Sequence, residues 1–321
     1  MLRKAPDLSF SGAQGKGALR RERLQHLAPR AALRQSGGVE EPIDTDPPIE
    51  RVSDRWSDIS DPQLAADAAE RLARRAAAPS EVEARRRALD LLDPRPGEIV
   101  VEVGAGSGIV SLEVAARVAP GGRVFAVDAS GPLLAHARAA ATAAGVGHMI
   151  DCRVADGRQL PFGQAAFDAA LSHWVLLHVD EPIGLLAEMK RVTRRGGRVM
   201  CVEMDWETLV VHPAPVAVTR RILHHAQSRQ VDAWSGRRLV PLFRECGFRD
   251  ITVEPIVDID EGTGDRTWLD YLTEHAEIAV AGKVITEQEG RTWSARLEEA
   301  FASGRFFFAV TQFAVMGRVP E

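Results

Sequence analysis

The sequence predicts an α/β fold: a mostly parallel sheet of seven strands with helices on both faces and an added helical cap. The first observation is that short apolar runs alternate with helical stretches between residues 99 and 203, the rhythm of βαβ units. The second is that these runs do not alternate apolar with polar residues, which indicates strands covered on both faces. The third is a glycine-rich segment, residues 104–108, between the first strand and the first helix of that rhythm.

Composition narrows the classes of function. The chain has 321 residues, a net charge of −5, 45% hydrophobic residues and 26% charged residues, values that are ordinary for a globular protein in water. Duplex nucleic acid is not an expected partner, because its binding depends on basic patches. No apolar run is long enough to cross a bilayer, so membrane insertion is not expected either. The three cysteines form no CxxC pair, which favours reduced thiols in a cytoplasmic protein.

The start of the chain differs from the rest. Residues 1–55 are rich in charged residues, glycine and proline, and are expected to form a disordered or poorly ordered tail. An organellar transit peptide and a start codon assigned too early are alternatives, so whether the mature protein contains this tail is open. Residues 56–96 are expected to form two helices. Asp61 precedes a proline as an N-cap, and Ser80 with Glu83 resembles a capping box.

Residues 97–204 carry the βαβ rhythm, and residues 205–321 complete the sheet. The expected strands are residues 99–103, 124–127, 150–154, 167–172, 199–203, 251–259 and 306–319. The expected helices beyond the first two are residues 109–118, 133–144, 183–193, 215–231, 239–246, 268–281 and 287–303. The last two lie in an insertion of about residues 265–304, which is long for a plain connection. It is a candidate substrate-binding lid or an element that pairs two subunits, so a homo-oligomer is an open alternative.

The glycine segment distinguishes between two classes of cofactor. It reads Gly104-Ala105-Gly106-Ser107-Gly108, and Glu102 precedes it. A dinucleotide-binding loop has the pattern G-x-G-x-x-G, and its third glycine would stand at Ile109. Here the third glycine comes one residue earlier, and an acid two positions ahead of the loop is unusual for NAD binding. The pattern argues against an NAD(P)-dependent oxidoreductase, which stays the alternative enzyme class.

An acid followed by G-x-G-x-G resembles motif I of the class I S-adenosylmethionine (SAM)-dependent methyltransferases. Asp128 ends the second strand as an acid does in that family, and Asp156-Gly157 resembles its segment after the third strand. The run from Phe167-Asp168 to Arg191-Val192-Thr193-Arg194-Arg195-Gly196-Gly197 is similar to the branch that acts in quinone biosynthesis and on other small molecules. The resemblance covers residues 97–204 and implies a Rossmann-like methyltransferase fold.

The resemblance also implies which residues hold SAM. Asp128 would accept hydrogen bonds from both ribose hydroxyls, and Asp156 with the backbone of Gly157 would read the adenine edge. Glu102 would act through water near the amino group of SAM, orient the glycine loop, or do both. The full set of implied contacts is Glu102, Gly104, Ala105, Gly106, Gly108, Asp128, Ala129, Asp156, Gly157, Ser172 and His173.

Methyl transfer from a sulfonium is an in-line displacement, so the enzyme mainly aligns the nucleophile, the methyl carbon and the sulfur. A general base is needed only where the nucleophile must lose a proton. His173, directly after the fourth strand, is the candidate base, and a histidine with a purely structural role is the alternative. Trp206, His212 and Arg237 are candidate substrate-binding residues, although an arginine at a helix start is more often a surface residue. No metal site is expected.

These patterns predict a SAM-dependent methyltransferase that acts on an oxygen, nitrogen or carbon nucleophile of a small organic molecule, quinone-like or a secondary metabolite. A SAM-binding protein without methyl transfer is a further alternative, because cofactor binding does not prove transfer.

Overall fold

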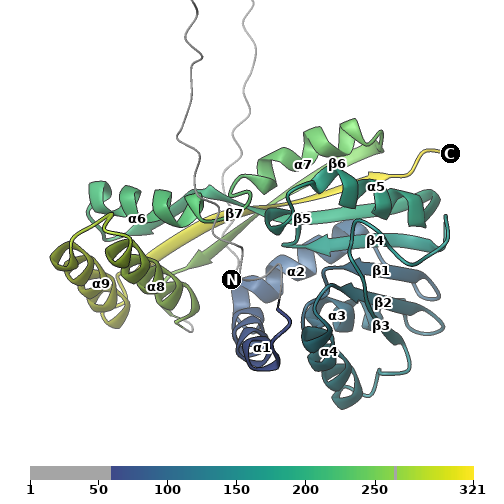
Figure 1. Ribbon diagram of the computed structural model, residues 1–321, viewed down its shortest axis with the longest axis horizontal. Coiled ribbons are helices and arrows are strands. Elements are labelled where there is room, and N and C mark those ends of the chain that lie inside the picture. Colours follow the sequence, from purple (N-terminus) through teal and green to yellow (C-terminus); the bar gives the residue numbers. More distant parts are fainter. Residues whose placement is uncertain (1–58, 264–265) are drawn as a thin grey trace, which may run out of the picture. The chain divides into compact units, whose positions relative to one another are not determined.

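The computed structural model describes residues 59–263 and 266–321, so the predicted tail at residues 1–55 lies outside the described residues. Within the described part, seven strands form one sheet in the order β3-β2-β1-β4-β5-β7-β6 (Figure 1). The strands are β1 (Ile99–Val103), β2 (Arg123–Asp128), β3 (Ile150–Val154), β4 (Phe167–His173), β5 (Thr193–His212), β6 (Arg249–Asp260) and β7 (Phe307–Arg318). Neighbours from β3 to β5 pair in parallel, whereas β7 pairs antiparallel with β5 and β6. The predicted seven-stranded, mostly parallel sheet is confirmed.

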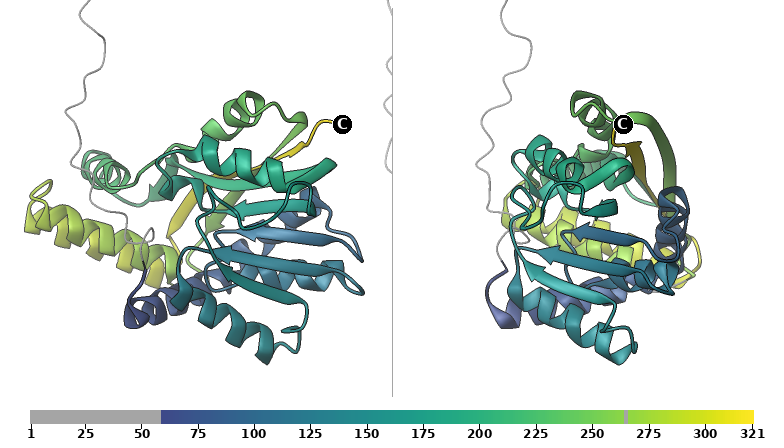
Figure 2. Two further views of the ribbon diagram at one scale, coloured as in Figure 1. Left: turned by 45° about the vertical axis from the view of Figure 1, so that its right-hand side comes forward. Right: turned by 90° about the vertical axis from the view of Figure 1, so that its right-hand side faces the viewer.

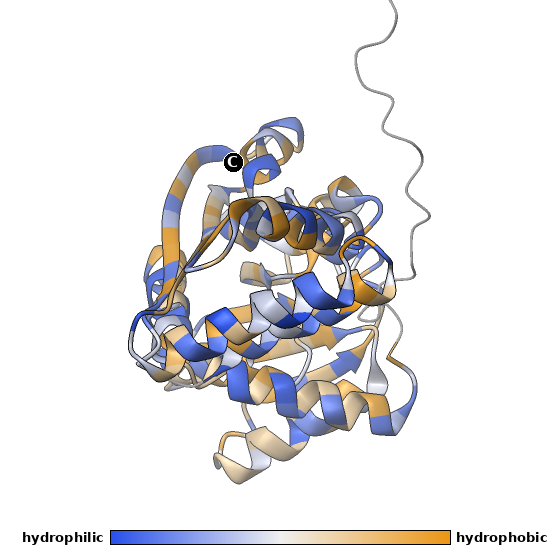
Figure 3. Cartoon of the chain, turned by 90° about the vertical axis from the view of Figure 1, so that its left-hand side faces the viewer, coloured by the Kyte–Doolittle hydropathy of each residue, from blue (hydrophilic) through white to orange (hydrophobic). Residues whose placement is uncertain are grey.

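Two helices of the described chain precede β1, others follow β1, β2 and β4, and the rest lie after β5. They are α1 (Pro62–Ala76), α2 (Pro79–Leu92), α3 (Ile109–Val118), α4 (Gly131–Ala143), α5 (Pro182–Val192), α6 (Val216–Ser228), α7 (Ser235–Glu245), α8 (Thr267–Ala281), α9 (Glu287–Ala302) and the short 3-10 helix η1 (Leu176–His178). Hydrophilic and hydrophobic stretches alternate along them (Figure 3), as in helices that bury one side.

Different helices cover the two faces of the sheet. On one face α2 and α3 bury residues such as Leu89 and Val114 against alternate residues of the strands. On the other face α5 and α7 bury Leu186 and Phe243 completely. Both views of Figure 2 show the sheet between these helical layers. Truncation of Phe243 to alanine would cost about 3–5 kcal/mol, because a packed core closes such a cavity only partly.

The N-terminal helices begin at prolines, and their caps differ. The Asp61 side chain accepts hydrogen bonds from the backbone N–H of Gln63 at 2.7 Å and of Leu64 at 3.0 Å, so the predicted cap of α1 is confirmed. The predicted capping box at Ser80 is wrong, since α2 begins one residue earlier, at Pro79, and its N-cap makes no side-chain hydrogen bond. Proline at this position presets the helical backbone angle, so the helix starts without the serine.

β5 is far longer than the predicted residues 199–203. It pairs with β7 from Arg198 opposite Arg318 to His212 opposite Phe307, with one irregularity between Asp205 and Val210. Residues 204–212, which lie beyond the predicted strand, therefore continue it. The reason is pairing with a strand more than ninety positions away, which local sequence does not show.

Three added helices, α6, α8 and α9, pack against the far end of the long β5–β7 pair (Figure 1). Their buried core is aromatic: the rings of Trp268 and Phe308 stack with centroids 4.4 Å apart, and Trp293 is 1% exposed. α8 and α9 are the helices of the predicted insertion. None of the described helices combines the length and apolar character that a membrane span requires.

Candidate cofactor and substrate site

A cavity of about 910 Å³ opens at the carboxyl ends of β1, β2 and β4. Ligands in open α/β sheets bind at this edge, where the strand order reverses. The wall on the side of the sheet contains Glu102, Asp128 and the glycine segment. The opposite walls come from α1, with Leu72 and Arg75 among them, and from α8, which belongs to the insertion predicted as a candidate substrate-binding lid.

The glycine loop requires glycine at each of its three positions. Gly104, Gly106 and Gly108 have φ angles of 76°, 52° and 82°, in the left-handed region that side chains disfavour. A Cβ on Gly104 would overlap the side chain of Val175, and one on Gly108 would lie 2.7 Å from the Cβ of Ala137. The loop is thus fitted between the segment after β4 on one side and α4 on the other.

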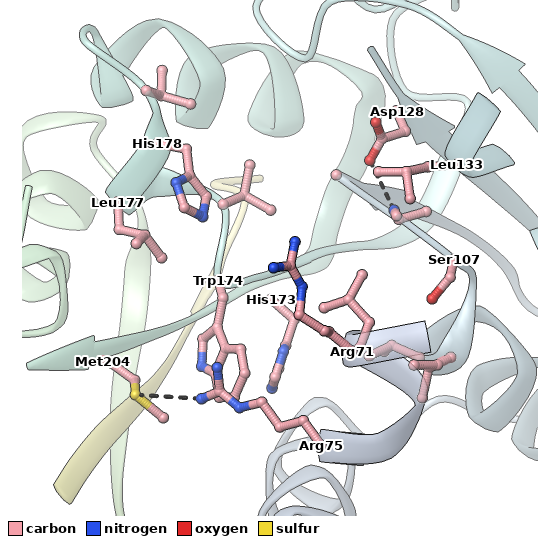
Figure 4. Close-up of a pocket in the computed structure, with 18 of the residues that line it drawn as sticks. Arg71, Arg75, Ser107, Asp128, Leu133, His173, Trp174, Leu177, His178 and Met204 are labelled. Carbon is pink, nitrogen blue, oxygen red and sulfur yellow. Dashed lines mark hydrogen bonds between the residues drawn. The ribbon is translucent and has the colours of Figure 1, made fainter. Parts of the chain in front are cut away.

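Asp128 holds the glycine loop from the end of β2. Its Oδ2 accepts the N–H of Gly106 at 2.8 Å (Figure 4), and its Oδ1 accepts the N–H of Ser130 at 2.8 Å. Burial raises the pKa of Asp128, and these two N–H groups oppose that rise. Each oxygen retains a second lone pair. The carboxylate is therefore placed to accept a pair of hydroxyl groups inside the cavity.

Glu102 lies deeper than Asp128 and is 2% exposed. Its Oε2 accepts a short hydrogen bond from the Ser111 hydroxyl. Burial raises the pKa of Glu102 to about 8; the bond from Ser111 opposes the rise, and the nearby Asp128 carboxylate adds to it. A cation close to Glu102 would reverse this shift, because it stabilises the ionised carboxylate.

The segment after β3 closes one end of the cavity. The Asp156 carboxylate pairs with Arg158 at 2.7 Å, and this hydrogen bond lowers the pKa of Asp156. A Cβ on Gly157 would lie 2.7 Å from Val103, so only glycine lets this segment approach β1. Both residues line the cavity.

The part of the cavity beyond the glycine loop has aromatic walls. Trp206 stacks on Tyr271 with ring centroids 5.2 Å apart, and Trp174 lies beneath the guanidinium of Arg75 (Figure 4). The cavity wall also includes Met204 and His275. Sequence patterns pointed to Trp206 alone, because Arg75, Tyr271 and His275 lie on amphipathic helices without a motif. The one available signal was the expectation that the insertion, which contains Tyr271 and His275, binds substrate.

His173 lines the cavity, and its Nε2 is buried without a hydrogen-bond partner among the described residues. Burial lowers the pKa of His173 to about 3, and the positive charges of Arg85 and Arg75 add to this. The ring is therefore neutral near pH 7 and accepts a proton poorly. His178, in η1, also lines the cavity and lies on the same side of it as Leu177 (Figure 4).

The structure brings together most of the residues singled out from the sequence. Glu102, Gly104, Ala105, Gly106, Asp128, Ala129, Asp156, Gly157, His173 and Trp206 line one cavity.

Four others lie off its wall: Gly108, Ser172, His212 and Arg237. His212 is exposed at the end of the extended β5, and Arg237 pairs with Asp205 and, at 2.6 Å, with Glu207. His212 misses the cavity because residues 204–212 continue β5, and Arg237 misses it because these acids hold its side chain. Across residues 59–263 and 266–321, no group of three or more His, Cys, Asp or Glu side chains is placed to hold a metal ion.

The comparisons with known proteins agree with this geometry. The family described as Methyltransferase domain matches residues 101–201, which span β1 to β5 and the glycine loop. The match is confined to this segment of the chain. A structure of a candidate methyltransferase from Bacillus halodurans C-125 has the same fold, with a TM-score of 0.52 at 18% identity, over 74% of this chain and 99% of that one.

Two curated relatives narrow the comparison. An uncharacterised 37.1 kDa protein in transposon TN4556 of Streptomyces fradiae is 31% identical over 231 residues, which is 72% of this chain and 65% of that protein. A demethylmenaquinone methyltransferase from Symbiobacterium thermophilum is 34% identical over 109 residues, 34% of this chain and 43% of that enzyme. The chain thus spans less than two thirds of the curated relatives it matches.

Proposed function

We propose that this protein is a SAM-dependent methyltransferase that acts on a small organic molecule. The observation that carries the proposal is the convergence of Glu102, the glycine loop and Asp128 on one wall of a cavity whose other walls are aromatic. The methyltransferase family match over the same residues supports it. The curated relative named as a demethylmenaquinone methyltransferase supports a quinone-like acceptor.

The residues present suit SAM as a ligand. Asp128 would accept the two ribose hydroxyls, Glu102 would face the α-amino group, and the Asp156-Gly157 segment would contact the adenine. The buried Ser107 hydroxyl lines the same wall and has no partner among the described residues, so a polar ligand would satisfy it. SAM supplies an electrophilic methyl group on a sulfonium.

The protein's own contribution is alignment and exclusion of water. Trp174, Trp206 and Tyr271 would hold a planar acceptor against the glycine-loop side, and helices α1 and α8 would shield it from solvent. A neutral His173 would orient the acceptor as a hydrogen-bond partner. A proton taken from an acceptor hydroxyl would need a stronger base than His173. The proposal covers oxygen, nitrogen and carbon nucleophiles.

Two narrower expectations belong to the same proposal. A cytoplasmic location is supported by three free cysteines, which a reducing compartment favours. The net charge of −5 supports a small acceptor over nucleic acid.

The test is formation of S-adenosylhomocysteine from SAM with a panel of phenols, hydroquinones and amines, measured by mass spectrometry. We expect product formation that depends on the acceptor and is lost in Asp128→Asn. Asp151→Asn is the matched control, because Asp151 pairs with Arg153 on β3 and lies off the cavity wall. Binding of NADPH in place of SAM would make the protein an oxidoreductase, and SAM binding without any product would make it a SAM-binding module.

A further inference from the structure

The segment after β4, residues 174–178, links the two halves of the cavity. Trp174 begins it with φ 58°, a left-handed conformation that is unfavourable for a tryptophan unless its surroundings hold it. Val175 packs against Gly104 of the glycine loop. Trp174, Leu177 and His178 face the cavity (Figure 4). A small shift of this segment would move both the loop expected to hold the cofactor and the wall expected to hold the acceptor.

One buried side chain outside the cavity wall holds this segment. Glu203, on β5, is 0% exposed, and its Oε1 accepts the N–H groups of Val175 at 2.8 Å and Leu176 at 2.7 Å. Its Oε2 accepts the N–H of Leu177 at 3.3 Å and the hydroxyl of Ser235 at 3.0 Å. A single carboxylate thus satisfies three successive backbone donors that would otherwise be buried without a partner.

Burying a carboxylate costs free energy unless hydrogen bonds compensate for the lost hydration. Burial raises the pKa of Glu203 to about 7, and the N–H groups of Leu176 and Val175 oppose that rise. A neutral amide or an apolar residue would avoid the cost of burying a charge. Neither would accept all four hydrogen bonds, because an amide has one acceptor oxygen and an apolar group has none.

We propose that Glu203 is a positioning residue that fixes the segment 174–178 and so sets the geometry between the glycine loop and the acceptor wall. The functional part of this inference rests on the proposed methyltransferase activity. The structural part, that the carboxylate holds three backbone amides in place, does not depend on it.

Three variants separate the contributions. Glu203→Gln keeps the length of the side chain but turns one oxygen into a donor, which faces either Leu177 and Ser235 or Val175 and Leu176. Glu203→Asp keeps the charge on a shorter side chain. Ser235→Ala removes one hydroxyl donor and leaves the carboxylate bound to the backbone, so it keeps the inference testable should a Glu203 variant fail to fold.

The measurement is amide hydrogen exchange of the peptide containing residues 175–177, with and without S-adenosylhomocysteine. We expect exchange of these amides to rise about tenfold or more in Glu203→Gln and by less in Ser235→Ala, since each lost bond loosens the segment. For any phenol, hydroquinone or amine that is methylated, kcat should fall about tenfold, and by a larger factor than the KM for SAM rises, because alignment of the two halves of the cavity depends on this segment.

Glu188→Gln is the matched control. Glu188 also holds a loop through its carboxylate, which accepts the N–H of Leu160 at 3.0 Å and pairs with Arg191, but it lies off the cavity wall. We expect it to leave exchange at residues 175–177 and kcat unchanged. Unchanged exchange in Glu203→Gln that still binds S-adenosylhomocysteine would overturn the inference. A wild-type protein that binds neither SAM nor S-adenosylhomocysteine would overturn the proposed function instead, whatever the exchange shows.

Discussion

The guanidinium carbon of Arg75 lies 3.5 Å from the centroid of the Trp174 ring, so the last turn of α1 rests on the segment that follows β4. The same guanidinium pairs with Glu81 at 3.0 Å, and the Glu81 side chain is only 2% exposed. A second aromatic ring, Trp268 of α8, has its centroid 4.7 Å from this carbon. The Arg75 guanidinium therefore joins α1 and α8 to the aromatic wall of the cavity.

Loss of this cation should destabilise the protein. Arg75→Gln leaves the buried Glu81 without its ion pair, so we expect the free energy of unfolding to fall by about 2 kcal/mol. Arg74→Gln is the control, because Arg74 pairs with Glu70 at 3.5 Å on an exposed surface. It should change the free energy of unfolding by less than about 0.5 kcal/mol. Urea unfolding of the two variants decides this, and equal effects would show that the Arg75 contacts contribute nothing specific.

Asp128 should matter for SAM binding more than for folding. Asp128→Asn keeps the shape but replaces one acceptor oxygen by a donor, so a ribose hydroxyl or the N–H of Gly106 loses its partner. We expect the dissociation constant for SAM to rise about 10- to 100-fold. Isothermal titration calorimetry measures this, with Asp151→Asn expected to bind as the wild type does. Binding by Asp128→Asn at wild-type affinity would remove Asp128 from the proposed site.

Glu102 should make the stability of the ligand-free protein depend on pH. Its folded pKa of about 8 exceeds the ordinary glutamate value of 4.5, so the folded state keeps a proton that the unfolded state releases. This contribution is full below about pH 4.5 and is lost as the pH rises to about 8. Glu102→Gln cannot release a proton, so its unfolding free energy relative to wild type should rise across that range, by at most about 1.4 kcal/mol per pH unit. Glu70→Gln, at an exposed position, should show no such trend.

SAM should reverse the effect of burial on Glu102. Its ammonium group near the carboxylate would favour the ionised form, so SAM binding below pH 8 should release a proton to the buffer. Calorimetry in buffers of different ionisation enthalpy detects the release. Its absence in Glu102→Gln would assign it to this residue, and an equal release from both proteins would exclude Glu102 as its source.

The glycine loop should tolerate no side chain at its first position. Gly104→Ala forces a Cβ against Val175 and places alanine at φ 76°. We therefore expect the free energy of unfolding to fall by about 2–4 kcal/mol and SAM binding to be lost. Gly163→Ala is the control, because a Cβ there meets nothing within 4 Å. Thermal unfolding compares the two. A Gly104→Ala protein as stable as Gly163→Ala would contradict the tight packing of this loop.

The sequence predicted the parts of the site that are built from local motifs. Glu102 lies near the carboxyl end of β1, the glycine loop follows β1 directly, and Asp128 ends β2, so their spacing alone brings them to one edge of the sheet. The prediction that His212 binds substrate failed to place it at the cavity, because the length of β5 depends on pairing with the distant β7. Sequence reasoning also missed Arg75, whose place at the cavity depends on how α1 packs, and the packing of a helix leaves no motif in its sequence.

The role of Glu203 could not be predicted from the sequence either. This glutamate ends a predicted strand and looks like any acid at a strand end. Its role as acceptor for three successive N–H groups arises only from the turn that residues 174–178 adopt, which local propensity does not specify.

The central claim is tested most directly by thermal unfolding of ligand-free protein with an excess of SAM, S-adenosylhomocysteine, NAD⁺ or NADPH. A ligand at about 100 times its dissociation constant stabilises the folded state by roughly 2.7 kcal/mol. We predict a higher melting temperature with SAM and S-adenosylhomocysteine only. A shift with NADPH, or none with the two adenosyl sulfur compounds, would contradict the assignment of this cavity to SAM.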